Sequence, residues 1–223
     1  SLNLVPTNAH DVVIDINATI DLNTPTLTIN TLTISNSAVV TFTASGSNRT
    51  LTIDDTPSSI GSGSSLTLNG SGSLNMNLAF SGTSRVMDIA GSLIITATGG
   101  GGRYNATNSL TTVTGLFKND GSGGGTTGTL TCSAANFTVG TNGTYEHALA
   151  AGTIPTVTWD ATSTCYVTGT VSTFPSGLGQ SLGNLTFNCS GMTATLSLPS
   201  TGLSIAGNLY IQNTGSGAIS LQQ

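Results

Sequence analysis

The feature that most constrains this fold is a short repeat that begins with glycine. The pattern Gly-[Ser/Thr/Asn]-Leu-x-apolar occurs five times, at residues 72–76, 91–95, 128–132, 183–187 and 207–211. The two middle intervals between successive copies are near double the outer ones, and we expect each of them to hide one degenerate copy. A unit of about 19 to 28 residues follows, a period typical of solenoids, in which each unit packs only against its neighbours.

The repeat units carry the pattern of β-strands. Residues 26–29, 31–34 and 51–53 alternate threonine with leucine or isoleucine, which places the apolar side chains on one face of a strand. Nothing between these strands resembles a crossover helix. We therefore predict an all-β chain, a right-handed parallel β-helix (a β-solenoid) of pectin-lyase-like type, with about nine or ten coils and a length of roughly 40–50 Å. The repeat leucines, Leu93 and Leu209 among them, should stack inside.

Composition restricts the classes of function. Thr, Gly, Ser and Asn together make up just over half of the 223 residues, whereas Asp, Glu, Lys and Arg make up only 6%. Four cations against nine acids exclude a strongly basic nucleic-acid-binding surface. The apolar runs are far too short for membrane insertion. A surface of hydroxyl and amide groups with so little charge is typical of extracellular bacterial surface proteins.

We expect one continuous solenoid over residues 1–223, with a soft subdivision near residue 140, where aromatic residues become more frequent. The glycine-rich stretches 99–103 and 121–128 should bulge as loops. Residues 123–128 match G-x-G-x-x-G, but a dinucleotide site needs a helix after the motif, and residues 129–132 have a strand pattern. We predict neither a cofactor nor a metal site.

The two ends of the chain lead to a further expectation. A solenoid whose last coil is uncovered exposes its apolar interior and a strand edge. Residues 215–221 have the pattern of the corner and opening of another coil. We therefore expect a fragment of a longer protein, with the neighbouring domains of the same chain as its first partners.

Several segments resemble modules of a known group of proteins. Residues 11–15 through 32–38 are similar to the first coils of parallel β-helices in large secreted Bacteroidota proteins, and Tyr145-Glu146-His147, 152–159 and 163–165 resemble a module that recurs in them, as does the continuation at 178–189. Together these segments span about a third of the chain. Such proteins are typically exported by the type IX secretion route and act as surface or adhesin-like modules. The resemblance implies an extracellular or cell-surface location and brings no catalytic motif.

Two function classes follow. The first is a non-enzymatic, structural or adhesin-like module, with surface glycans or other cells as further partners. The alternative is a carbohydrate-binding or polysaccharide-degrading domain, whose groove would be lined by Tyr145, Trp159 and Tyr166 with the acids Glu146 and Asp160, because aromatic faces stack on sugars. Within one strand, Tyr145 and His147 should share one face while Glu146 takes the opposite face. This arrangement argues against an acid–base pair of Glu146 with His147.

A third possibility is ice binding by a ladder of threonines. About ten Thr-x-Thr pairs occur, such as Thr26/Thr28 and Thr41/Thr43, and a flat face needs one pair on each coil at the strand spacing. The spacings are too irregular for a single ladder, and outward threonine also suits any solvated strand.

The three cysteines match no zinc or redox spacing. Cys165 and Cys189 are separated by close to the length of one coil, so that they can form a disulfide across neighbouring coils. The competing interpretation is a buried stack of free thiols. We favour the disulfide, with Cys132 unpaired.

Overall fold

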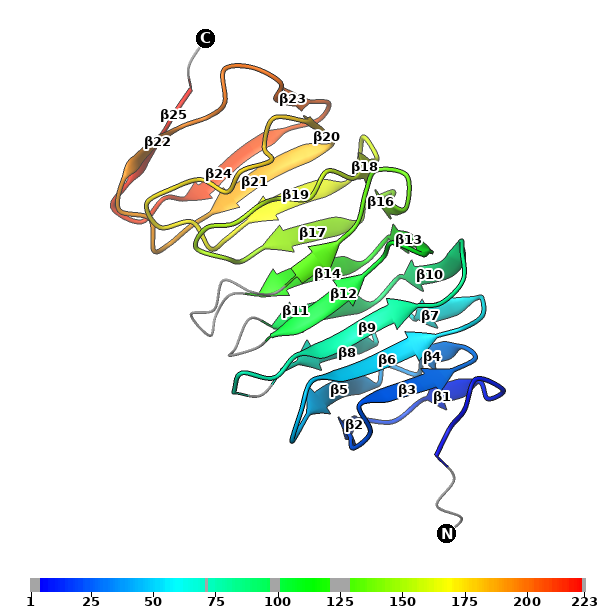
Figure 1. The fold of residues 1–223 in the computed structure, drawn as a ribbon. Coiled ribbons are helices and arrows are strands. Elements are labelled where there is room, and N and C mark those ends of the chain that lie inside the picture. Colours follow the sequence, from blue (N-terminus) through cyan, green and yellow to red (C-terminus); the bar gives the residue numbers. More distant parts are fainter. Residues whose placement is uncertain (1–4, 71, 97–100, 121–128, 222–223) are drawn as a thin grey trace.

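The computed structural model describes residues 5–70, 72–96, 101–120 and 129–221. In these residues the chain is a β-solenoid in which every strand pairing is parallel, and no helix is present (Figure 1). The motif at residues 123–128 and the bulge expected at 121–128 lie outside the described residues. Of the loop expected at 99–103, residues 99 and 100 also lie outside the described residues, and residues 102 and 103 belong to a strand instead.

The chain winds through three sheets, here called A, B and C, in that order. Sheet A contains β1 (Val12–Ile14), β4 (Leu32–Ile34), β7 (Ser58–Ile60), β10 (Arg85–Ile89), β13 (Ser109–Val113), β16 (Phe137–Val139) and β18 (Thr158–Trp159). Sheet B contains β2 (Ala18–Leu22), β5 (Val39–Ala44), β8 (Ser65–Asn69), β11 (Ser92–Thr96), β14 (Leu116–Asp120), β17 (Thr144–His147), β19 (Thr164–Val167), β21 (Asn184–Asn188) and β24 (Leu209–Asn213).

Sheet C is shorter, and two small sheets follow it in the last turns. Sheet C contains β3 (Thr26–Ile29), β6 (Arg49–Ile53), β9 (Met76–Phe80), β12 (Gly102–Asn105) and β15 (Thr129–Thr131). The pairs β20 (Ser181–Leu182) with β23 (Ser204–Ile205) and β22 (Thr195–Ser197) with β25 (Ala218–Ser220) flank the last strands of sheet B. Sheets A and B both run on across residue 140.

The length of the solenoid follows from the number of strands in sheet B. Its nine strands take the chain through about eight turns, fewer than the nine or ten coils that we predicted. At the usual strand spacing these turns extend roughly 38 Å. Along sheet B one turn takes about 20 to 28 residues, which is a typical solenoid period. The step from Tyr145 to Cys165 is at the short limit, and the step from Phe117 to Tyr145 is the longest. The predicted repeat length is therefore confirmed.

The repeat leucines mark one inward column of sheet B. Leu93 lies between Leu66 and Phe117 in register and is fully buried, as predicted. The whole column is Ala18, Val40, Leu66, Leu93, Phe117, Tyr145, Cys165, Leu185 and Leu209. Leu209 is only half-buried, because β24 has a neighbouring strand of sheet B on one side alone.

The repeat glycines of sheet B stand at the corner that leads into it, after a strand of sheet A at Gly91 and after β20 at Gly183. A Cβ on Gly91 would lie 2.2 Å from the carbonyl oxygen of Ser64, and one on Gly183 would lie 2.4 Å from that of Asp160. No side chain fits at such distances. The copy at Gly72 is different, since it leads into sheet C and requires glycine for its φ of +61°. The copy at 128–132 also leads into sheet C, as β15.

The corner before sheet B reveals the degenerate copies. Gly115 and Gly143 precede Phe117 and Tyr145 as Gly91 precedes Leu93, and Ser163 precedes Cys165 in the same way. The first long gap therefore hides one copy, as expected. The second hides two, because the turns that follow Tyr145 are short enough for both to fit.

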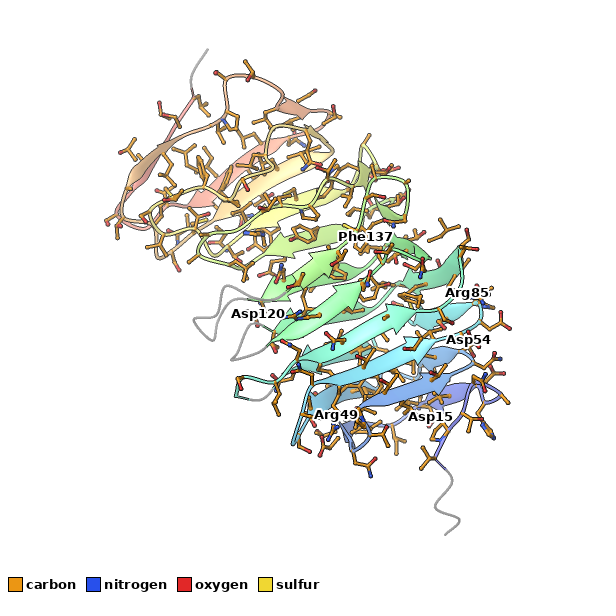
Figure 2. The ribbon with its side chains drawn as sticks, viewed as in Figure 1. Asp15, Arg49, Asp54, Arg85, Asp120 and Phe137 are labelled. Atoms are coloured by element: carbon orange, nitrogen blue, oxygen red, sulfur yellow. The ribbon has the colours of Figure 1, made fainter. Side chains whose placement is uncertain are left out.

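The interior changes from aliphatic to aromatic along the axis. Rings in successive turns pack with centroids 5.2 to 6.2 Å apart; they belong to Phe80, Tyr104, Phe117, Phe137, Tyr145 and Trp159. Phe137 lies within the winding in Figure 2, whereas the labelled charged residues Arg49, Asp54, Arg85 and Asp120 lie where strands begin or end. These four charged residues thus lie at corners, where the Arg49 side chain is buried, while the rings fill the interior.

The corner geometry makes a direct prediction for Gly115→Ala. The new Cβ would meet the carbonyl oxygens of Gly91 and Ala90 at 2.1 and 2.4 Å, so we expect a loss of about 2–3 kcal/mol in the free energy of unfolding. Urea denaturation measures the change. Gly140→Ala is the matched control, because its nearest neighbour is a methyl group at 3.4 Å; equal losses in both variants would contradict the close-approach argument.

Candidate functional site

The five residues proposed for a sugar-binding groove do not meet on one surface. Tyr145 is fully buried in the inward column of sheet B. Trp159 pairs with the buried Val139 at the end of sheet A and also faces the interior, where its ring packs edge-on against Tyr145. The groove predicted from these residues is therefore wrong, because two of its three aromatic rings belong to the core.

Glu146 and Tyr166 do share the outer face of sheet B. They pair in register on the neighbouring strands β17 and β19. The Lys118 ammonium lies 3.3 Å from Glu146 Oε1, and the Thr168 hydroxyl donates a hydrogen bond of 3.0 Å to the same oxygen. Asn188 donates one of 2.7 Å to the Tyr166 hydroxyl. These contacts hold both side chains in place.

Asp160 lies at the corner before β19, where it accepts hydrogen bonds within the turn. Its carboxylate accepts hydrogen bonds from the backbone and the hydroxyl of Thr162, at 2.8 and 2.6 Å. These bonds lower the pKa of Asp160, because they favour the charged form. Asp160 therefore shapes a turn and does not join Glu146.

His147 lies on the inner side of β17, opposite to Glu146, so the sequence argument against a Glu146–His147 pair is confirmed. Its Nε2 lies 3.1 Å from the carbonyl oxygen of Ala151, and its Nδ1 lies 3.4 Å from the Tyr145 hydroxyl. Burial lowers the pKa of His147 below its ordinary value of 6.5, and the contact with Ala151 opposes this only in part. Burial likewise raises the pKa of Tyr145 far above its ordinary value. Both side chains are neutral members of the core.

Two arginines form a corner motif that the sequence analysis missed. In Ser45-Gly46-Ser47-Asn48-Arg49 and Ser81-Gly82-Thr83-Ser84-Arg85, the arginine donates to the carbonyl oxygen of the serine four residues earlier. The glycine in each has a positive φ, +74° and +71°. Arg85 also lies 3.6 Å from Asp55. The S-G-x-x-R pattern, which occurs at both places in the sequence, could have identified this motif.

The Thr-x-Thr pairs are spread over several faces. Thr26/Thr28 and Thr50/Thr52 do stack on adjacent turns of sheet C. The next two turns of these columns carry Asn77 with Ala79 and Arg103 with Asn105, while Thr41/Thr43 lies on sheet B. The prediction that the spacings give no single ladder is confirmed.

The predicted disulfide between Cys165 and Cys189 is not formed, and all three cysteines are free. Cys165 pairs in register with Leu185, because the turn is short there, so Cys189 lies four positions out of step. The Cys189 thiol instead contacts the carbonyl oxygen of Val167 at 3.3 Å. Burial raises the pKa of the Cys165 thiol to about 12.

Within the described residues, no group of three or more His, Cys, Asp or Glu side chains is arranged to hold a metal ion. The same residues include no helix with the length and apolar character needed to cross a membrane.

The buried His147 predicts how stability depends on pH. Because the pKa of His147 is lowered in the folded chain, the unfolded chain binds more protons at this histidine as the pH falls through about 6.5, and the free energy of unfolding should fall by about 1 kcal/mol between pH 7.5 and 5.5. Urea denaturation at both pH values tests this. His147→Val, which copies Val167 on the next turn, should flatten the dependence; an unaltered slope in this variant would refute the assignment.

The cysteines give a chemical prediction. Without reductant, alkylation in denaturant should add three groups to the intact mass, because all three thiols are free. In the folded protein Cys165 should stay unmodified, since it is fully buried and only a thiolate reacts readily. Mass spectrometry of both samples decides the matter, and a single added group in denaturant would establish the disulfide instead.

The sequence matches no protein-family model and no curated protein, and no solved structure matches the chain. The function of this solenoid must therefore be argued from its own residues.

Proposed function

We propose that this chain is a non-enzymatic structural module of a large extracellular bacterial protein, a stalk-like or adhesin-like β-solenoid. The observation that carries the proposal is the unbroken parallel pairing from β2 to β24 over a continuous buried core. Because solenoid length grows in proportion to the number of turns, such a body holds neighbouring parts of a protein apart at a defined distance.

The surface chemistry supports an extracellular role. An outward column of sheet B begins with three hydroxyl side chains, those of Thr19, Thr41 and Thr67. Three of the four cationic side chains serve corners or pairs within the solenoid, namely Arg49, Arg85 and Lys118. Charge is therefore used for local structure, and hydration depends on groups that keep their state when external pH changes.

The resemblance to secreted Bacteroidota modules supports the finer part of the proposal, export by the type IX route to the cell surface. Partners would be neighbouring domains of the same chain, and surface glycans or other cells. Ile211 on the outermost strand β24 is 46% exposed, an apolar surface suited to a neighbouring domain. We also propose right-handed winding of the pectin-lyase type, since parallel crossovers almost always have that hand.

The proposal is tested on intact cells of the source organism. Antibodies against residues 1–223 should label unpermeabilised cells, and external protease should remove the label. Labelling that appears only after permeabilisation would overturn the surface role. In parallel, polysaccharides incubated with the purified chain should release no new reducing ends; release that disappears in Glu146→Ala would show an enzyme instead.

A further inference from the structure

A groove follows the corner between sheets A and B on the outside of the solenoid. It has a volume of about 530 Å³ and crosses five consecutive turns, about 19 Å at the usual strand spacing. Its lining consists of Gly63, Ser64, Ser65, Ala90, Gly91, Ser92, Gly115, Leu116, Thr144, Glu146 and Tyr166. Its volume lies within the range of ligand-binding sites in proteins, about 300–1,000 Å³.

The groove exists because the corners differ in length. Four residues join β7 to β8, β16 to β17 and β18 to β19, whereas only two join β10 to β11 and β13 to β14. The longer corners close with hydrogen bonds such as Ser64 N to Gly61 O and Gly143 N to Gly140 O. In the short corners Gly91 and Gly115 bond straight to the turn before, at Ile60 and Ile89. The short corners therefore form a floor between raised ends.

The far end of the groove carries its most distinctive side chains. Glu146 is fixed by Lys118 and Thr168, both through Oε1, and Tyr166 is fixed by Asn188. Within the described part of the chain, Glu146 Oε2 has no hydrogen-bond partner, so it is available as an acceptor. Side chains already held in place lose little conformational entropy on binding.

These groups suit a hydroxyl-rich ligand. A free carboxylate oxygen accepts from hydroxyl groups, the hydroxyls of Ser65 and Ser92 both donate and accept, and the ring of Tyr166 with Leu116 offers apolar surface. The straight course over five turns suits an extended chain. An extended peptide would find few backbone partners here. Strand addition needs a free sheet edge, whereas the backbone groups beneath the groove are already paired in the parallel ladders.

We propose that this groove binds a linear, uncharged oligosaccharide, with Glu146 Oε2 accepting from sugar hydroxyls and Tyr166 packing against a sugar face. This site differs from the one predicted from the sequence, because Tyr145, Trp159 and Asp160 take no part in it. The binding rests on the proposed adhesin-like role, for which it names the site and the class of glycan, and it requires no cleavage of the glycan.

The test uses the purified chain on an array of neutral linear oligosaccharides, covering glucans, xylans, mannans, galactans and chitin fragments, followed by calorimetry with the tightest ligand. We expect Glu146→Gln and Tyr166→Ala to weaken binding about tenfold, the scale of one lost hydrogen bond or ring contact. Ser92→Trp should abolish binding by filling the floor. Tyr210→Ala is the matched control, since Tyr210 follows Tyr166 and Thr186 in the same outward column but does not line the groove.

Each result has one meaning. Melting temperatures confirm that the variants fold, and if Ser92→Trp does not, the other two variants decide. Failure to bind any array member at millimolar concentration, binding that survives all three variants, or retention of extended peptides in place of glycans would overturn the proposal. None of these results would affect the cell-surface test of the structural role.

Discussion

Backbone hydrogen bonds between each turn and the next, in parallel register, are the interaction on which the whole molecule depends. They require the chain to return to the same place after every turn, and the backbones of successive turns come closest at the corner that leads into sheet B. Gly91, Gly115 and Gly183 stand there with the previous turn's carbonyl oxygens closer than any Cβ could tolerate. At these three positions glycine is required by a close approach between the backbones of two turns, and the apolar residue two positions later packs in the core.

The scarcity of charge has a matching structural explanation. In the described residues the buried inward positions of the strands carry uncharged side chains apart from Arg49 at the start of β6, and many outward positions carry hydroxyl groups. Arginine is used where a corner needs several donors at once, as Arg49 donates to both Ser47 and Ser45. The Lys118–Glu146 pair joins adjacent turns on the outer face in the same manner. Such pairs contribute little stability individually, but they orient side chains.

Much of the fold could be predicted from the sequence, because period, alternation and glycine placement all act within one turn. What could not be predicted depends on register between turns. The short turn after Cys165 puts this residue opposite Leu185, so a spacing close to the average turn gave the wrong partner for Cys189. Tyr145 is predicted on a ligand surface because a tyrosine ring can pack in a core or stack on a sugar. Its place in the core becomes clear only when Gly143 is recognised as a repeat glycine, because Tyr145 then stands where the repeat has its inward leucine. Lys118 lies one full turn before Glu146, and no local pattern links them.

The stacking of strands across the axis has a mechanical consequence. A pull along the solenoid acts in line with the hydrogen bonds of sheet B, and these join only successive turns. A loaded chain would therefore peel from an end, one turn at a time, without a single large rupture. Each turn, of about 20 to 28 residues along sheet B, would release roughly 70–100 Å of extended chain. A tether of this kind lengthens under tension while the turns that are still wound keep their shape.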